Sequence, residues 1–292
     1  MTPERFEYVA PASLDEATST LRDLGDEAKV MAGGQSLLSL MKLRLASPRY
    51  VVDLGRVPAL NYIRDEGDAI AIGALVTYAE LKASALLRER CALLPRAASV
   101  VGDVQVRNRG TIGGALAHAD PAGDLCAAVL ALDARLKLVS TRGERWVWAG
   151  EFFLGMYASV LEPDEVLAEI RVPAIAGWRC AYLKAARRPS DFALVGVAVR
   201  CRIDGRACAD LAMAITGVSD RVFRARSVEE ALNGRELETA LIEETASRSM
   251  DGVDVSGDIH ASSEYRTHLA RVYVSRAIRA VGAISGPPTP SV

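Results

Sequence analysis

Two glycine-rich segments contain the residues whose types and spacing are best suited to chemistry. The first has the sequence K-V-M-A-G-G-Q-S-L-L at Lys29–Leu38, and the second is R-N-R-G-T-I-G-G-A-L-A-H-A-D-P-A-G-D at Arg107–Asp124. Each has paired glycines beside small or hydroxyl side chains, and such a backbone can press its N–H groups against a phosphate. One such segment is typical of an ordinary turn. Two of them predict a ligand held at two places, as a dinucleotide with its diphosphate would be.

The first segment lies where a strand is expected to give way to a helix. Lys29–Met31 favours a short strand, Gly33 and Gly34 follow it, and a helix is predicted to start near Ser36. Successive N–H groups from Ala32 to Leu37 can then form a nest closed by the helix N-terminus, which suits a diphosphate. Taken alone, the segment is equally consistent with a plain glycine turn before a helix.

Two common phosphate-binding motifs are missing from the sequence. The first segment has no G-x-G-x-x-G register, and the chain has no G-x-x-x-x-G-K-[ST]. These absences exclude the Rossmann and P-loop interpretations. Asp53 lies about twenty residues beyond Gly33, where a Rossmann protein has its ribose-binding acid. Without the fingerprint, Asp53 is interpreted as a structural residue at the end of a strand.

The second segment adds a hydroxyl and a carboxylate to its paired glycines. Thr111 precedes the glycines, and Asp120 followed by Pro121 predicts the start of a helix with Asp124 in its first turn. A carboxylate there is a natural acceptor for a sugar hydroxyl. The alternative is that Asp124 does no more than interact favourably with the helix dipole.

The bulk composition excludes several classes of partner. The 292 residues include 35 Lys and Arg against 37 Asp and Glu, so no net field attracts nucleic acid or an anionic membrane. No apolar run is long enough to span a bilayer, and the first residues lack a secretory pattern. We therefore expect a cytoplasmic protein that neither binds nucleic acid nor inserts into a membrane.

The cysteines and histidines are not spaced as metal ligands. No C-x-x-C occurs, and five cysteines, an odd number, argue against a disulfide framework. His118 is interpreted as a polar loop residue, because the sequence offers it no base or nucleophile as a partner. If the protein handles electrons, its redox centre must be a bound organic cofactor.

The elements that must position the two segments fall into three pieces of α+β type. A β-α-β unit is predicted at 1–55, mixed helices and strands at 56–175, and a third piece at 176–285. Within the third piece, apolar strands flank Asp204-Gly205, which is a strong hairpin signal, and three helices follow. The tail at 286–292 is predicted to be disordered.

Six motifs, taken together, resemble one known family. They occur in the family's order along nearly the whole chain, so the chain resembles the flavin-binding medium subunit of molybdenum-containing hydroxylases. That group includes carbon monoxide dehydrogenase, nicotine dehydrogenase and xanthine dehydrogenase. The motifs are A-G-G-Q-S-L-L, Q-V-R-N-R-G-T-I-G-G, A-x-A-D-P-A-G-D, D-E-V-L-A-E-I-R-V-P at Asp164–Pro173, Y-L-K-A-A-R-R-P-S-D-F-A at Tyr182–Ala193 and S-S-E-Y-R-T-H-L at Ser262–Leu269.

The resemblance implies a fold and a cofactor. The fold would be the vanillyl-alcohol-oxidase type (PCMH-like), an FAD-binding domain of two subdomains at 1–55 and 56–175. A C-terminal α+β domain like that of the CO dehydrogenase flavoprotein, an antiparallel sheet with helices, would follow. FAD would lie extended between the subdomains. By matching position, its diphosphate and adjoining groups would be cradled by Lys29, Val30, Met31, Ala32, Gly33, Gly34, Gln35, Ser36 and Leu37.

Other residues would complete the site by matching position. The second wall would be Thr111, Ile112, Gly113, Gly114 and Ala115, with Val101 packing nearby. Many relatives carry Asn or Ser where this chain has Ala115, so one side-chain hydrogen bond would be lost. Asp124 would bind a sugar hydroxyl, Leu167 would contact the adenine end, and Lys184 would point into the FAD site. A cation there would stabilise an anionic reduced flavin.

The resemblance also implies an electron-transfer role with no protein acid or base. A small partner subunit would carry two [2Fe-2S] clusters, and a large partner would carry the molybdopterin cofactor that hydroxylates the substrate. This FAD subunit would pass the electrons to oxygen, a quinone, a cytochrome or NAD. The assembly would be a dimer of heterotrimers. Two alternatives stay open: a self-contained FAD-dependent reductase or oxidase, and a non-catalytic scaffold subunit.

Overall fold

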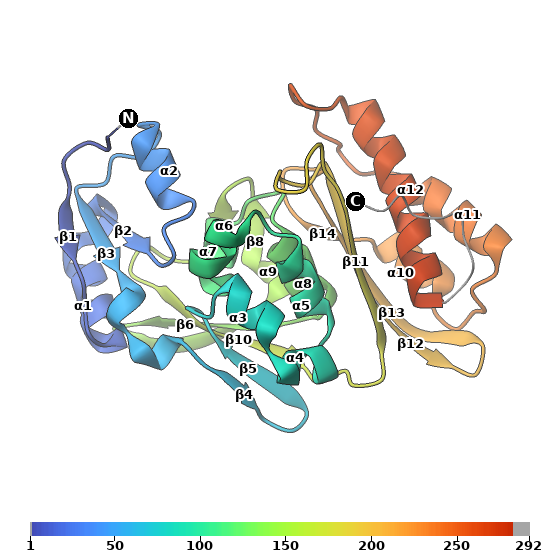
Figure 1. Cartoon of the computed structure of the whole chain (residues 1–292), viewed down its shortest axis with the longest axis horizontal. Coiled ribbons are helices and arrows are strands. Elements are labelled where there is room, and N and C mark those ends of the chain that lie inside the picture. Colours follow the sequence, from blue (N-terminus) through green and yellow to red (C-terminus); the bar gives the residue numbers. More distant parts are fainter. Residues whose placement is uncertain (1, 283–292) are drawn as a thin grey trace.

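The computed structural model describes residues 2–282, so the tail predicted at 286–292 lies outside the described residues. In these residues the chain forms three successive regions, drawn from blue through green to orange and red in Figure 1. We call them the first lobe, the second lobe and the C-terminal region. The predicted α+β class is confirmed, since each region combines a sheet with helices.

The first lobe is a parallel sheet in the order β1-β3-β2, flanked by helices. Helix α1 begins after Ser13, whose side chain accepts a hydrogen bond from the Glu16 N–H, and ends at Gly25 with φ +53°. The predicted strand–glycine–helix order is confirmed, because β2 leads through Gly33 and Gly34 into α2. The elements are β1 (Glu7–Val9), α1 (Leu14–Leu24), β2 (Ala28–Met31), α2 (Leu37–Lys42) and β3 (Tyr50–Asp53).

The second lobe is an antiparallel sheet in the order β4-β5-β10-β6-β7, with helices packed on one face. Alternate residues of β6 and β10, such as Leu136 and Ile170, point into the core beneath these helices. The strands are β4 (Ile63–Asp65), β5 (Ala69–Gly73), β6 (Arg135–Ser140), β7 (Gly143–Trp148) and β10 (Val166–Pro173), with a separate hairpin of β8 (Phe153–Gly155) and β9 (Ala158–Ser159). The helices are α3 (Tyr78–Ala83), α4 (Ala85–Arg90), α5 (Leu93–Ser99), α6 (Val104–Arg109), α7 (Ile112–His118), α8 (Asp124–Ala131) and α9 (Ala149–Phe152).

The C-terminal region contains an antiparallel sheet, β11-β12-β13-β14. This sheet lies between helices of the second lobe and the helices of the C-terminal region itself (Figure 1). One face packs on the second lobe through Tyr182 and Ala198, and the other packs on α12 through Val197 and Met213. The predicted hairpin at Asp204-Gly205 is confirmed. The elements are β11 (Arg179–Ala185), β12 (Val195–Asp204), β13 (Ala207–Thr216), β14 (Phe223–Arg224), α10 (Arg226–Leu232), α11 (Thr239–Arg248) and α12 (Ser263–Gly282).

The prediction that a helix starts at Asp120-Pro121 is wrong by one turn. Helix α8 begins at Asp124, with Gly123 as its N-cap. The Asp120 carboxylate instead accepts a hydrogen bond from the Ala122 N–H at 2.8 Å. This local turn, which Asp forms readily, competes with helix capping. Asp124 is nevertheless in the first turn of the helix, as predicted.

No helix among residues 2–282 combines the length and the apolar character needed to cross a membrane. The same residues contain no cluster of three or more His, Cys, Asp or Glu that could hold a metal ion.

Candidate functional site

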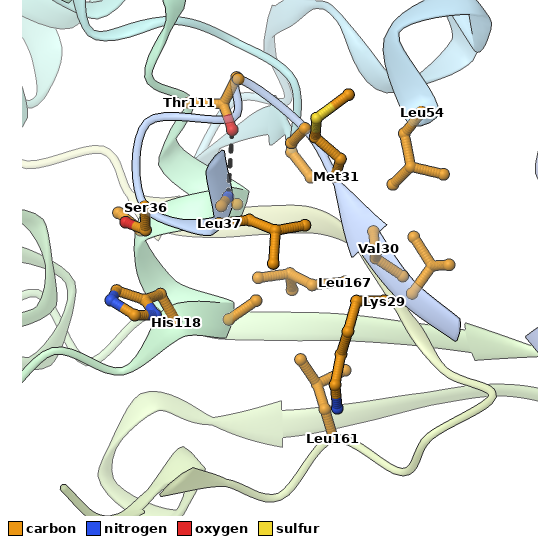
Figure 2. A pocket seen from close by; sticks show the side chains of 18 of the residues that line it. Lys29, Val30, Met31, Ser36, Leu37, Leu54, Thr111, His118, Leu161 and Leu167 are labelled. Carbon is orange, nitrogen blue, oxygen red and sulfur yellow. Dashed lines mark hydrogen bonds between the residues drawn. The ribbon is translucent and has the colours of Figure 1, made fainter. Parts of the chain in front are cut away.

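A cavity of about 540 Å³ lies between the first and second lobes, and both glycine segments line it. The β8–β9 hairpin and the start of β10 complete its wall. The cavity therefore brings together three parts of the chain that are far apart in sequence (Figure 2). Of the residues predicted for the site, those that line the cavity are Lys29, Val30, Met31, Ala32, Gly33, Gly34, Gln35, Ser36, Leu37, Thr111, Gly113, Gly114, Ala115 and Leu167.

The two glycine segments touch at Gly33. A Cβ atom at this position would lie 1.9 Å from the carbonyl oxygen of Arg109 and 3.0 Å from the Cα of Gly110. Because no side chain fits in that space, only glycine allows the two lobes to approach this closely. The contact places the backbone of the first segment directly against the start of the second.

The first segment carries a row of free amide groups. Within the described residues, no backbone N–H from Gly33 to Leu37 donates a hydrogen bond, and the next amide, that of Leu38, donates to the Gly34 carbonyl at 3.1 Å. Gly34 has φ +75°, a left-handed conformation in which glycine is favoured. Five successive free amides that line a cavity are a suitable receptor for the oxygens of a diphosphate.

The second segment has the same paired glycines, but its amides are already used. The Gly113 N–H donates to the Ala74 carbonyl at 2.9 Å, and the Ala115 N–H donates to the Thr111 carbonyl at 3.0 Å. Thr111 caps helix α7, because its Oγ1 accepts a hydrogen bond from the Gly114 N–H at 3.1 Å. This segment therefore forms a rigid wall of the cavity, and its glycines serve close packing.

Four predicted site residues do not line the cavity: Val101, Ile112, Asp124 and Lys184. The Ile112 side chain is fully buried in the core. The Asp124 carboxylate is buried and accepts hydrogen bonds from the Tyr182 hydroxyl at 2.5 Å and the Lys184 Nζ at 2.9 Å. Lys184 also donates to the Val100 carbonyl at 3.2 Å, beside Val101. Asp124 and Lys184 thus join the second lobe to the C-terminal region.

Burial sets the protonation of this cluster. It raises the pKa of Asp124, while the Lys184 charge and the hydrogen bonds from Lys184 and Tyr182 act in the opposite direction. It also raises the pKa of the Tyr182 phenol well above the usual value, and the neighbouring Asp124 adds to the effect. Tyr182 therefore stays protonated and donates to Asp124.

The sequence interpretation missed His118 and Tyr157, which both line the cavity. Their ring centroids lie 5.0 Å apart. His118 ends helix α7, whereas Tyr157 belongs to the turn of the β8–β9 hairpin, and Figure 2 shows the imidazole on the same side of the cavity as Ser36. Sequence spacing gives no signal for this contact, because it depends on how the hairpin packs against α7.

The cavity lies between two α+β lobes. A row of free amides forms one wall, and a capped glycine turn forms the other. This arrangement defines a nucleotide-cofactor-binding protein. Comparison with known families specifies the cofactor. Residues 4–175 match the FAD binding domain in molybdopterin dehydrogenase, and residues 180–281 match the CO dehydrogenase flavoprotein C-terminal domain. The chain belongs to the family of FAD-binding medium subunits of molybdenum hydroxylases.

Individual relatives are similar over nearly their whole length. The carbon monoxide dehydrogenase medium chain of Hydrogenophaga pseudoflava is 40% identical, covering 97% of this chain and 99% of the relative. The glyceraldehyde dehydrogenase medium chain of Sulfolobus acidocaldarius is 36% identical, covering 96% and 100%. A solved structure of the carbon monoxide dehydrogenase from H. pseudoflava superposes with a TM-score of 0.95 at 41% identity, covering 98% of this chain and 100% of that chain.

Proposed function

We propose that this chain is the electron-transfer subunit of a heterotrimeric molybdopterin-dependent dehydrogenase or hydroxylase. It takes electrons from the [2Fe-2S] clusters of a small partner subunit and passes them to an external acceptor: oxygen, a quinone, a cytochrome or NAD. A large partner subunit carries the molybdopterin cofactor and binds the substrate. Relatives that are medium chains of dehydrogenases support this division of labour, and one similar solved structure is a Cu,Mo carbon monoxide dehydrogenase.

The free amides of Gly33 to Leu37 are the observation that carries the proposal. They supply the phosphate-binding half of a dinucleotide site, in which the diphosphate oxygens of FAD accept hydrogen bonds from these amides. The capped turn at Thr111 holds the opposite wall, and Leu167 provides an apolar surface at the adenine end. The fit also depends on Gly33, because its missing Cβ lets the two walls meet.

The chain's residues bind and orient the cofactor, and none is needed as an acid or base. When bound, the flavin supplies the redox chemistry, since it can exchange electrons singly or in pairs. Asp124 and Lys184 have a positioning role: as a buried ion pair they fix the start of α8 against β11. In this proposal Val101 and Ile112 pack behind the site and keep its second wall in place.

The proposal includes the organisation of the chain and its assembly. The FAD-binding domain comprises subdomains at 1–55 and 56–175, and the C-terminal domain follows at 176–285. Family matches that end at residue 175 and resume at residue 180 support the second boundary. We expect the subunit to work in the cytoplasm within a dimer of heterotrimers.

Co-expression with the two partner subunits tests this function. The purified chain should hold one FAD, released on denaturation, and should turn over no small substrate by itself. In the complex, substrate added without an acceptor should bleach the flavin absorbance, and omission of the iron–sulfur subunit should abolish the bleaching. Turnover by the isolated chain would instead identify a self-contained oxidase or reductase. Failure to bind FAD would identify a scaffold subunit.

A further inference from the structure

We propose that His118 contacts the phosphates of the bound cofactor and takes up a proton when FAD binds, so that FAD affinity rises as the pH falls. This inference rests on the proposed FAD site and assigns a role to a residue outside both glycine pairs. Three observations carry it: an imidazole without a partner in a cavity, a backbone arrangement that holds it there, and the charges around it.

The imidazole faces the cavity with its hydrogen-bonding groups unused. His118 is half-buried and lines the same cavity as Ser36 and Leu37, at the end of the row of free amides (Figure 2). Neither ring nitrogen has a hydrogen-bond partner among residues 2–282, and neither does the Ser36 hydroxyl. The ring therefore retains both a donor and an acceptor for a ligand in the cavity.

A pair of strained residues holds the imidazole in this place. Ala119, directly after His118, has φ +50°, and Tyr157 has φ +55°, both in the left-handed region that non-glycine residues rarely adopt. The Tyr157 N–H donates to the Ala119 carbonyl at 3.1 Å, which joins the two strained residues. Strain of this kind persists where the surrounding structure enforces it, and it is concentrated at ligand sites.

Burial favours the neutral form of the ring before the cofactor binds. Burial lowers the pKa of His118, and Asp120, in the connection to α8, acts against this effect. Asp124 at the start of α8 is paired with Lys184, and Glu165, directly before β10, is paired with Arg145. Glu162, Asp26 and Lys29 line other parts of the cavity wall, and Tyr157 presents only a neutral phenol.

A diphosphate placed against the free amides adds negative charge beside this neutral ring. An adjacent negative charge favours the imidazolium, so the pKa of His118 should be higher in the complex than in the free protein. A group whose pKa rises on binding contributes affinity that is fully present below its pKa in the free protein and is lost as the pH rises through its pKa in the complex. A rise of one unit corresponds to a tenfold gain in affinity at low pH.

Nuclear magnetic resonance of the whole chain tests the inference directly, because the sequence contains only three histidines. Titration of their ring protons between about pH 5 and pH 8, the range in which histidine changes charge, gives each pKa with and without ligand. We expect FAD to raise the pKa of His118 and leave His260 and His268 unchanged. ADP, which has a diphosphate but no flavin, should also raise the pKa of His118. A rise with FAD alone would show that the ring senses the flavin and would overturn the phosphate assignment.

Variants give a second readout in FAD affinity. Wild-type protein and the control His260→Gln should bind FAD about tenfold more tightly at about pH 5.5 than at pH 8. His118→Gln keeps a hydrogen-bonding side chain without the titration, and its affinity should be independent of pH. An unchanged pH dependence in His118→Gln would refute the inference and leave the FAD site intact. Absence of FAD binding in the wild type would refute the proposed function instead.

Discussion

The two glycine pairs are alike in sequence and differ in what their backbones do. At Gly33 and Gly34 the amides are free and line a cavity. At Gly113 and Gly114 the amides donate to Ala74 and Thr111, and a Cβ at residue 113 would lie 2.5 Å from that of Ala74. The first pair leaves hydrogen-bond donors free for a ligand, whereas the second pair allows helix α7 to pack closely against Ala74. A glycine-rich motif thus indicates a phosphate site only where its amides lack partners within the protein.

The substitution Gly33→Ala should weaken ligand binding more than the other substitutions. Its Cβ would meet the Arg109 carbonyl, so the segments must separate and the row of amides must shift. Loss of one or two charge-assisted hydrogen bonds, each worth about 1.5 to 3 kcal/mol, should weaken FAD binding about a hundredfold. Isothermal titration calorimetry measures this loss, with Gly150→Ala as the control because residue 150 has no close neighbour. Unchanged affinity in Gly33→Ala would contradict the role of the first pair.

The substitution Gly113→Ala should lower the stability of the chain more than its FAD affinity, the reverse of what we expect for Gly33→Ala. Its Cβ would lie 2.7 Å from the Ala74 carbonyl oxygen inside the core, and overpacking of this kind lowers the free energy of unfolding by about 2 kcal/mol. Denaturant unfolding of the cofactor-free chain measures the change. FAD affinity of the folded variant should fall much less than in Gly33→Ala. A folded, fully stable variant that no longer binds FAD would show that both pairs bind the ligand alike.

The smallest effect on stability is expected for Gly34→Ala. Gly34 and Gly252 share φ +75°, and alanine in the left-handed region costs about 1 to 2 kcal/mol. Gly252→Ala is the control for the backbone conformation alone, because a Cβ at residue 252 would meet nothing within 4 Å, whereas a Cβ at residue 34 would lie 2.9 Å from the Leu38 Cδ1. Thermal unfolding should show a loss in both variants, at least as large in Gly34→Ala because its Cβ also displaces the Leu38 side chain, and only Gly34→Ala should also weaken FAD binding. Equal FAD affinity in both would mean that the conformation of Gly34 does not matter for the site.

Much of the fold follows from local patterns, whereas the roles of site residues depend on distant partners. The order strand, glycines, helix at β2–α2 and the hairpin at Asp204-Gly205 were predictable, because turn chemistry and periodicity act over a few residues. The state of the Gly113 amide depends on Ala74, and the surroundings of Asp124 depend on Lys184. Neither pairing has a signal in sequence spacing. The sugar-hydroxyl role of Asp124 stays a prediction, because its carboxylate is paired with Tyr182 and Lys184 and does not line the cavity.

Hydrogen exchange at single-residue resolution tests the central claim most directly, because it reads the amides of both segments in one sample. Without ligand, the amides of Gly33 to Leu37 should exchange quickly, whereas those of Gly113 and Ala115 should be protected by their internal hydrogen bonds. Addition of FAD should slow exchange from Gly33 to Leu37 strongly and change the second segment little. FAD binding without new protection from Gly33 to Leu37 would contradict the account.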